Sequence, residues 1–422
     1  MIAKVFPGKC KGKVTIPPSK SMAHRAIICA SLAKGISRID NVAYSQDILT
    51  TIDGMRSLGA EIIKHDDFLE ITGIGKITEC KQQEIFCNES GSTLRFFIPL
   101  FSLCNKRIVF SGKGRLMDRP QSVYEKIFKN QGLSFQHENG TISIEGALQG
   151  GEFILDGDVS SQFISGLLFA LPLCDKPSTI VIKEPFESRS YVNLTMQMLE
   201  HFGIEAEFSD PNTIYIKGNQ EYHSGCYCVE GDFSQLAFFA CLAALNHDLE
   251  VCGVHHNSQQ GDKAIMRILK HAQVHFKEIV NGYAVAKSDP CGTIIDLADC
   301  PDLGPILCVL AAFSNGSTHI KNAGRLRIKE SDRIAAMECE LKKLGVRIRS
   351  DENDIYIDGS TAYEGGVKFD AHNDHRIVMS LAVAATLCEK PCTIHGAEAV
   401  RKSYPQFFDD LIRIGIEVER YE

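Results

Sequence analysis

The chain has 422 residues, of which 44% are hydrophobic and 23% are charged, and it contains no tryptophan. This length favours two domains, because single hydrophobic cores rarely grow beyond about 250 residues. The formal net charge of −8 argues against nucleic acid or an anionic membrane as the general partner, since both require a broad basic face.

No apolar segment is long enough to suggest a membrane span. The longest apolar runs, 164–174 and 380–388, fall well short of the ~18 residues that cross a bilayer. Residues 1–10 lack the apolar stretch of a signal peptide, so the sequence predicts a cytoplasmic protein. The 16 cysteines include no CxxC pair, and we expect them to be small buried hydrophobes without a metal site.

The first unusual stretch is "IPPSKSMAHRA" at 16–26, where Lys20 and Arg25 fall at the start of an alanine-rich helix. Cations in the first turn oppose the helix dipole at a cost of a few tenths to about 1 kcal/mol. In one interpretation Ser19, Ser21 and the two cations bind a phosphate or carboxylate together with free helix N–H groups. In the other, a serine caps the helix and the cations are solvated.

The same kind of segment returns along the chain at intervals of about 70 residues. Each copy opens on Ser, Asp or Gly and is then apolar on nearly every face, which is typical of a fully buried helix. The predicted buried helices are 19–33, 90–104, 160–174, 231–245, 300–313 and 372–388.

A second repeated segment runs in phase with the first. Each buried helix is followed by a strand, a polar loop, an amphipathic helix that ends at glycine, and two alternating strands. The glycine position recurs in steps of 70 to 73 residues, at Gly59, Gly132, Gly203, Gln273, Gly345 and Gly415.

Strands that alternate with helices predict an α/β fold, here of six repeats with three in each of two domains. The repeat places the domain boundary near residue 230. If the repeats of a domain pack with pseudo-threefold symmetry, their buried helices run parallel. Six positive helix ends could then face one interdomain cleft and bind an anion.

Cations recur at two places in the repeat, the start of the buried helix and the polar loop before the amphipathic helix. They are Lys20, Arg25, Arg95, Arg115, Arg119, Arg189, Lys329, Arg333, His375, Arg376, Arg401 and Lys402. A single arginine in such a loop is more often a surface charge, but solvated charges have no reason to keep a 70-residue register. We therefore expect a substrate with several negative charges. Asp302, Glu330 and His375 lie among these cations and are suited to proton transfer.

At these residues the sequence resembles the 5-enolpyruvylshikimate-3-phosphate synthase family, whose members are 3-phosphoshikimate 1-carboxyvinyltransferases. The resemblance rests on "PPSKSMAHRA", "ESGSTLRFF", "GRLMDRP", "DGDVSSQF", "RIKESDR", "NDHR" and "RKSYP" in family order over nearly the whole chain. It implies a two-domain, inside-out α/β barrel fold with two crossover strands. One domain would comprise 1–15 and 230–422, the other 16–229, and the active site would lie in the interdomain cleft.

By resemblance, the enzyme transfers the enolpyruvyl group of phosphoenolpyruvate to the 5-hydroxyl of shikimate 3-phosphate and releases phosphate, without a metal or organic cofactor. The resemblance implies a monomer whose partners are small anionic molecules. The implied catalytic residues are Asp302 as base, Glu330 as proton donor, Lys20 and His375. The implied shikimate 3-phosphate residues are Lys20, Ser21, Arg25, Ser160, Ser161, Gln162, Ser188, Tyr191, Asp302 and Lys329. The implied phosphoenolpyruvate residues are Lys20, Gly91, Arg115, Gln162, Arg333, Arg376 and Lys402.

Three positions depart from the commonest family pattern: Glu89, Ser92 and Arg325, where we expect altered inhibitor or substrate contacts. Two alternatives stay open. UDP-N-acetylglucosamine enolpyruvyltransferases share the fold, but they carry a cysteine in the loop matching "GKGRLMDRP", and none occurs between Cys104 and Cys174. RNA 3′-phosphate cyclase-like enzymes share part of the architecture, but the acidic charge and the absence of a nucleotide-binding loop count against them.

Overall fold

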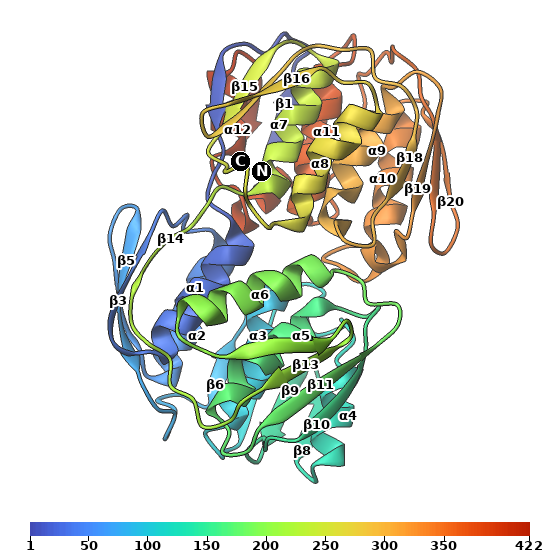
Figure 1. Ribbon diagram of the computed structural model, residues 1–422. Coiled ribbons are helices and arrows are strands. Elements are labelled where there is room, and N and C mark those ends of the chain that lie inside the picture. The colour runs from blue at the N-terminus through green and yellow to red at the C-terminus, as the bar shows by residue number, and fades with distance from the viewer. The chain divides into compact units, whose positions relative to one another are not determined.

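The computed structural model describes residues 1–422, and the chain divides into two compact units. One unit, here called the terminal unit, comprises Met1–Pro17 and Gly231–Glu422, and the other, the inserted unit, comprises Pro18–Glu230. Each unit has a hydrophobic core of its own. Figure 1 shows the inserted unit in blue to green and most of the terminal unit in yellow to red.

Three buried helices form the centre of the inserted unit, and three four-stranded sheets accompany them. The buried helices are α1 (Lys20–Leu32), α3 (Gly91–Ser102) and α5 (Ser161–Ala170), and the second helix of each repeat is α2 (Gln46–Leu58), α4 (Ser122–Asn130) or α6 (Arg189–His201). A short helix, η1 (Leu171–Leu173), follows α5.

The three sheets of the inserted unit have the same strand arrangement. The first is β14 (Cys226–Cys228), β3 (Lys34–Asp40), β5 (Phe68–Ile74) and β4 (Glu61–Lys64). The second is β6 (Glu84–Phe86), β7 (Ile108–Ser111), β9 (Thr141–Glu145) and β8 (Ser134–Glu138). The third is β10 (Glu152–Asp156), β11 (Ser178–Lys183), β13 (Thr213–Ile216) and β12 (Ala206–Asp210).

The terminal unit repeats this design, and its three buried helices contact one another. They are α7 (Phe233–Leu245), α9 (Gly304–Ala312) and α11 (His375–Thr386), and the second helices are α8 (Ala264–His271), α10 (Arg333–Lys343) and α12 (Phe407–Arg413). Short helical turns lie at η2 (Gly261–Lys263), η3 (Pro301–Leu303), η4 (Gly324–Ile328) and η5 (Ala397–Lys402).

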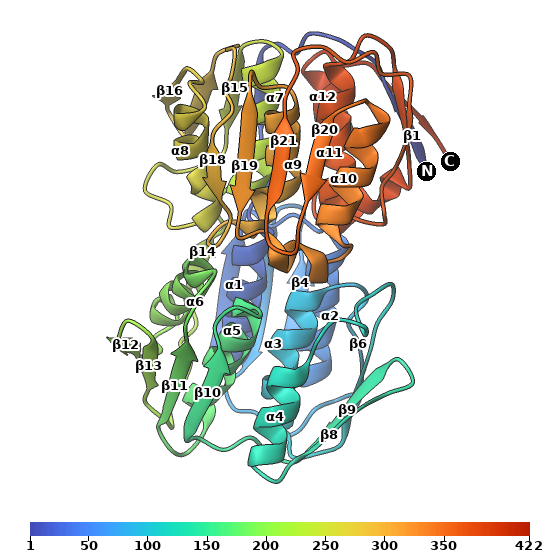
Figure 2. The same ribbon diagram turned by 90° about the vertical axis from the view of Figure 1, so that its right-hand side faces the viewer.

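Its sheets lie outside the buried helices, as Figure 2 shows for the one that begins with β18. The first sheet is β16 (Phe276–Ile279), β17 (Gly282–Val285), β15 (Leu249–Cys252) and β2 (Lys13–Thr15). The second is β18 (Ile294–Asp296), β19 (Ser317–Lys321), β21 (Ile355–Asp358) and β20 (Arg347–Ser350). The third is β22 (Lys368–Asp370), β23 (Cys392–His395), β1 (Ile2–Val5) and β24 (Val418–Tyr421).

The predicted inside-out α/β fold of six repeats is confirmed, with one strand per repeat that the sequence pattern missed. Each sheet has at one edge a short strand that pairs parallel to its neighbour, as β10 does with β11 and β2 with β15, whereas the other pairings are antiparallel. The missed strands are only three to five residues long, so they show little alternation.

Two of these edge strands are exchanged between repeats. Strand β2 precedes α1 in the chain, yet it pairs with β15 of the fourth repeat, with Lys13 opposite Glu250. Strand β14 precedes α7, yet it pairs with β3 of the first repeat, with Cys226 opposite Arg38. The N-terminal strand β1 completes the sixth sheet between β23 and β24, so Ile2 lies opposite Tyr421.

The repeated glycine position has a conformational cause. All six residues at this position, Gln273 included, have a positive φ, between 66° at Gln273 and 129° at Gly59. Glycine adopts this left-handed backbone without steric cost, which explains why it recurs where the amphipathic helix ends.

Most of the cysteines are buried, and none of the sixteen is in a disulfide. No helix of the chain combines the length and the apolarity that crossing a membrane requires.

Candidate active site

The starts of the buried helices carry polar side chains in both units. Five of the six helices have a Ser or Asp N-cap whose side chain accepts from a backbone N–H of the first turn: Ser19, Ser90, Ser160, Asp232 and Asp374. The sixth, α9, instead follows the turn η3, which contains Asp302. The N-cap interpretation of 16–26 is therefore correct for Ser19, and it leaves the cations of that stretch to be explained.

In the terminal unit a group of charged residues surrounds Arg333, which we call the Asp302 network. Its members are Asp302, Lys329, Glu330, Arg333, Asp374 and Arg376. They come from η3, the loop after η4, and the starts of α10 and α11.

Arg333 lies at the centre of this network and is 1% exposed. Its Nε donates to Oδ2 of Asp374 at 2.8 Å, and its Nη2 donates to Oε2 of Glu330 at 2.6 Å. Its Nη1 donates to Oδ1 of Asp302 at 3.2 Å. Three carboxylates around one guanidinium offset the cost of its burial and fix its orientation.

Asp302 is bound by three cations. Nη2 of Arg376 donates to its Oδ2 at 2.8 Å, and Nζ of Lys329 lies 3.6 Å from its Oδ1. Burial alone would raise the pKa of Asp302, but Arg376, Lys329 and Arg333 outweigh this effect and hold the pKa well below its ordinary value. Asp302 is therefore an ionised carboxylate that can accept a proton only when these cations have another partner.

The remaining predicted residues of this unit lie beside the network. Burial lowers the pKa of Lys329, partly offset by the attraction of Asp302. Nζ of Lys402 donates to the carbonyl oxygen of Asn373 at 2.6 Å. His375 is buried, and its Nδ1 lies 3.9 Å from Oδ1 of Asp374.

Asp262 is a buried acid that the sequence interpretation missed. Its Oδ2 accepts a hydrogen bond from Oγ of Ser234 at 2.6 Å, at the first turn of α7. Burial, followed by repulsion from Asp302, raises the pKa of Asp262 to about 7. No periodic pattern marks this residue in the sequence, because its significance depends on which loop packs beside Asp302.

In the inserted unit, cations on α1 are held by neighbouring helices. Nζ of Lys20 forms an ion pair with Oδ2 of Asp47 on α2 at 2.8 Å. Arg25 is 3% exposed, and its Nε donates to Oγ1 of Thr195 at 2.8 Å. Its other nitrogens donate to the carbonyl oxygens of Ser21 at 2.7 Å and Tyr191 at 3.0 Å. Arg25 thus joins α1 to α6 and fixes two predicted substrate residues.

The first turns of α3 and α5 meet through Gln162. Its Oε1 accepts from Nη1 of Arg95 at 2.9 Å, and its Nε2 donates to Oγ of Ser92 at 2.9 Å. Nη1 of Arg95 also lies 3.5 Å from Oγ of Ser160. Ser92, one of the departures from the family pattern, therefore orients Gln162.

Gly91 lies next to this group, and a neighbouring arginine differs from the predicted one. A Cβ added to Gly91 would lie 2.6 Å from Nη1 of Arg119 and 3.5 Å from Oε1 of Gln162. Arg119 is buried, whereas the predicted Arg115 is exposed on the same turn. The structure thus brings Arg119, not Arg115, to the start of α3. Both arginines occur in "GRLMDRP", and only the path of the turn decides which one points inward.

The predicted serines lie at two other helix starts. Ser161 begins α5, and Ser188 is the N-cap of α6 with a φ of 52°. Ser188 is 2% exposed and Tyr191 is half-buried. Helix starts with hydroxyl groups are well suited to bind a phosphate.

The two other departures have defined contacts. A Cβ on Gly114 would lie 2.5 Å from Oε2 of Glu89, so this carboxylate packs against the turn that carries Arg119. Nη2 of Arg325 donates to the carbonyl oxygen of Ala298 at 2.8 Å.

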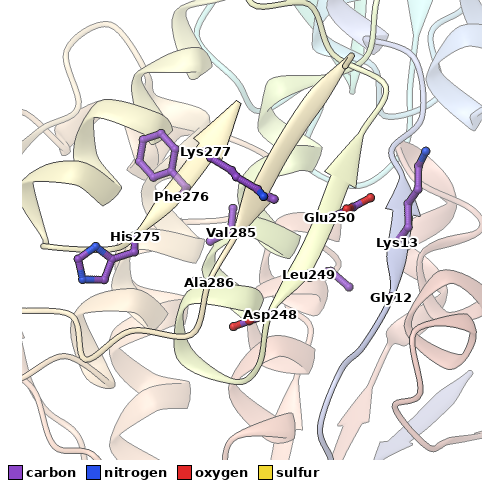
Figure 3. Close-up of a pocket in the computed structure, with 11 residues that line it drawn as sticks. Gly12, Lys13, Asp248, Leu249, Glu250, His275, Phe276, Lys277, Val285 and Ala286 are labelled. Atoms are coloured by element: carbon purple, nitrogen blue, oxygen red, sulfur yellow. The ribbon is translucent and has the colours of Figure 1, made fainter. Parts of the chain in front are cut away.

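A separate pocket of about 770 Å³ lies on the exposed face of the sheet that contains β15 and β2 (Figure 3). Lys13 and Lys277 line it together with Asp248 and Glu250, so it has no excess of cations. It contains none of the predicted site residues. The chain also contains no group of three or more His, Cys, Asp or Glu residues placed to hold a metal ion.

Comparison with known proteins identifies the family. The sequence model of EPSP synthase (3-phosphoshikimate 1-carboxyvinyltransferase) matches residues 6–411. The chain belongs to the EPSP synthase family. This confirms the predicted reaction class, the transfer of an enolpyruvyl group in the shikimate pathway of aromatic amino acid biosynthesis, and the family match does not support either alternative.

Curated relatives cover nearly the whole chain. The 3-phosphoshikimate 1-carboxyvinyltransferase of Clostridium botulinum (strain Eklund 17B / Type B) is 46% identical over 420 residues, which are 98% of this chain and 97% of that protein. The protein of the same name from Clostridium beijerinckii is 45% identical over 421 residues, with the same coverage of 98% and 97%.

Solved structures agree with the fold. An EPSP synthase from Acinetobacter baumannii has a TM-score of 0.80 at 27% identity and covers 99% of this chain and 100% of its own. The enolpyruvyl transferase NikO from Streptomyces tendae has a TM-score of 0.78 at 16% identity, covering 99% and 98% of the two chains, and shows a shared fold.

Proposed function

We propose that the enzyme transfers the enolpyruvyl group of phosphoenolpyruvate to the 5-hydroxyl of shikimate 3-phosphate. The observation that carries this proposal is the Asp302 network, in which an ionised carboxylate is held among three cations. Both substrates carry a phosphate and a carboxylate, so they can compete with Asp302 for these cations.

Shikimate 3-phosphate is assigned to the helix starts of the inserted unit. Ser160, Ser161 and Ser188 would bind its phosphate, because hydroxyls and free helix N–H groups converge at these positions. Ser21 and Tyr191 would contact the ring and its carboxylate. Arg25 would act by fixing both residues and by adding positive charge, since its nitrogens already donate to their carbonyl oxygens.

Phosphoenolpyruvate is assigned to cations of both units and to Gly91, where the absence of a Cβ allows the ligand to approach the backbone. The cations are Lys20, Arg115, Arg333, Arg376 and Lys402. Arg119 is added to this assignment, because it is buried beside Gly91 and Gln162. Gln162 contacts α3 and α5 and is assigned to both substrates.

The chemistry requires two proton transfers in opposite directions. Asp302 would take the proton of the 5-hydroxyl. Glu330 would take up a proton when an anionic ligand replaces it on Arg333, and it would then protonate C3 of phosphoenolpyruvate, so that C2 becomes electrophilic and a bond forms between C2 and the hydroxyl oxygen. In the tetrahedral adduct the bond between C2 and the phosphate oxygen then breaks. Glu330, now a carboxylate, would take a proton back from C3, so that the double bond is restored while the electron pair of the broken bond leaves with the phosphate, which Lys20 would stabilise.

Substrate binding would prepare Asp302 for its role. In the structure Arg376 and Arg333 hold the pKa of this carboxyl well below its ordinary value, which makes it a weak base. An anionic ligand bound to Arg376 and Arg333 would partly neutralise their positive charge. The pKa of Asp302 would then rise. Lys329 would keep contact with the carboxylate and with shikimate 3-phosphate. His375 is assigned a supporting role beside Asp374.

A coupled phosphate-release assay tests the proposal. The purified enzyme should release phosphate from phosphoenolpyruvate with shikimate 3-phosphate as acceptor and should be inactive with UDP-N-acetylglucosamine. Phosphate release with the UDP-sugar alone would overturn the proposed acceptor.

A further inference from the structure

Four buried side chains form a continuous hydrogen-bonded chain from α1 through α2 to the start of α3. Nδ1 of His24 lies 2.7 Å from Oγ1 of Thr51, which lies 2.7 Å from Oγ1 of Thr93. Oγ1 of Thr93 donates to Oγ of Ser90 at 2.7 Å. None of the four residues is more than 1% exposed.

The direction of the hydrogen bonds in this chain follows from the number of protons available. Thr93 has one hydroxyl proton, and it is donated to Ser90, so Thr51 must be the donor to Thr93. The proton of Thr51 is then used, and Nδ1 of His24 must be the donor to Thr51. His24 is therefore the Nδ1–H tautomer.

His24 stays neutral in this position. Burial lowers its pKa well below the ordinary value, and the cations Lys20 and Arg25 of the same helix lower it further. Asp47 on α2 is paired with Lys20. Because the ring does not gain a proton, the donor direction of the chain is fixed.

A histidine occupies this position although one of its ring nitrogens has no hydrogen-bond partner. Nε2 of His24 is buried and has no hydrogen-bond partner. A buried acceptor without a partner is unfavourable, so a purely packing role would be better filled by an apolar side chain.

The chain ends where phosphoenolpyruvate is assigned. Ser90 is the N-cap of α3, Gly91 is the first residue of that helix, and Ser92 orients Gln162. We infer that His24, acting through Thr51 and Thr93, is a positioning residue that sets the backbone at Gly91 for phosphoenolpyruvate. This inference rests on the proposed placement of phosphoenolpyruvate at Gly91.

The first test replaces the middle hydroxyl. Thr51→Val keeps the side-chain volume and breaks the chain, and it should raise the KM for phosphoenolpyruvate about tenfold, because small displacements of a binding backbone strongly affect ligand contacts. The KM for shikimate 3-phosphate should change less than about twofold. Thr50→Val is the matched control, because the Thr50 hydroxyl donates to the carbonyl oxygen of Gln46 within α2. This control should leave both KM values unchanged.

The second test separates donation from packing at the ring. An asparagine can place an N–H close to the position of Nδ1, so His24→Asn should keep the KM for phosphoenolpyruvate within about threefold of the wild type. His24→Leu, which has no donor, should raise it about tenfold. Imidazole ¹⁵N NMR should show His24 protonated at Nδ1 and not titrating between pH 6 and 8.

These outcomes can overturn the inference without ambiguity. It fails if Thr51→Val, folded by circular dichroism, behaves as Thr50→Val does, or if both KM values rise equally. It also fails if His24→Asn and His24→Leu are alike, which would leave only a packing role. Gly91→Ala separates this failure from that of the proposed function: if it leaves the KM for phosphoenolpyruvate unchanged, the placement of that ligand at Gly91 is wrong.

Discussion

Buried arginines of the two units have different hydrogen-bond partners. In the terminal unit, Arg333 and Arg376 donate to carboxylates, and Asp302 is shared between them. In the inserted unit, Arg25 donates to a threonine hydroxyl and to carbonyl oxygens, and Arg95 donates to an amide, a hydroxyl and a carbonyl oxygen. Both arrangements give the buried guanidinium groups hydrogen-bond acceptors, and in the terminal unit these acceptors are carboxylates that also balance the charge.

This difference corresponds to two tasks of the proposed reaction, anion binding and proton transfer. A cation held by neutral acceptors keeps its charge for a ligand, so the inserted unit is suited to binding anions. A cation held by a carboxylate must exchange that partner for the ligand, and the exchange changes the proton affinity of the carboxylate. The terminal unit is thereby suited to proton transfer.

The largest expected effect comes from removing the shared carboxylate of the terminal unit. Asp302→Asn should lower kcat by about 10³-fold, since a positioned general base typically contributes 10²–10⁴-fold. Asp47→Asn, which removes the partner of Lys20 in the inserted unit, should lower kcat less than about tenfold. Steady-state kinetics measure both, with Glu250→Gln on the exposed face of β15 as a control without effect. Equal losses for Asp302→Asn and Asp47→Asn would remove the functional distinction between the units.

The next effect concerns phosphoenolpyruvate binding by one arginine from each unit. Arg119→Ala and Arg376→Ala should each weaken binding by roughly 1.5 to 3 kcal/mol, the value of a hydrogen bond to a charged group. Binding of shikimate 3-phosphate should change much less. Isothermal titration calorimetry measures both ligands, and Arg115→Ala in the same turn shows which of the two arginines contributes more to binding. If Arg119→Ala has no effect while Arg115→Ala does, the addition of Arg119 to the site is wrong.

A smaller and more selective effect is expected at Gly91. The added methyl of Gly91→Ala would lie 2.6 Å from Nη1 of Arg119, so the guanidinium tip must shift. Glyphosate, a phosphonate with a carboxylate that is longer than phosphoenolpyruvate, should lose more affinity than the substrate. The measurement is the ratio of the glyphosate inhibition constant to the KM for phosphoenolpyruvate, in wild type and variant. An unchanged ratio would exclude Gly91 from the pocket.

The smallest effects are pH dependences of opposite sign in the two units. In the inserted unit, neutral His24 binds a proton only after unfolding, so the free energy of unfolding should fall by about 1.4 kcal/mol per pH unit below roughly pH 6.5. In the terminal unit, the pKa of Asp262 is raised to about 7. The folded state then holds a proton that the unfolded state loses above about pH 4, and stability should rise as the pH falls from 7.

Amide hydrogen exchange during urea unfolding at pH 5 to 7 reports on each unit separately. His24→Asn should reduce the pH dependence of the free energy of unfolding of the inserted unit. Asp262→Asn should reduce that of the terminal unit. If the free energy of unfolding changes with pH in the same direction in both units, the predicted difference between the units is wrong.

Much of the fold could be predicted because its signals are local. Fully apolar helices at a spacing of about 70 residues indicated six repeats. A positive φ at Gly59 and its five equivalents explains why glycine marks the end of five of the six amphipathic helices, with Gln273 at the sixth. The N-caps of the buried helices are short-range too, since Ser19 accepts from the backbone N–H of Met22.

The sequence by itself thus determined the repeat, the helix starts and the places of the cations within each repeat. Each repeat is recognised from local patterns, namely an apolar helix with its cap and a glycine at a helix end, and these patterns depend on residues a few positions apart. Only the tertiary structure decided that β2 and β14 pair with strands of another repeat. A strand of three residues has too few side chains to indicate its pairing partner in the sequence. It also decided that Arg119 rather than Arg115 lies beside Gly91, and that His24, Thr51 and Thr93 form one chain. Thr51 and Thr93, which are hydrogen-bonded to each other, are 42 positions apart in the sequence, and this hydrogen bond forms only when their helices pack together.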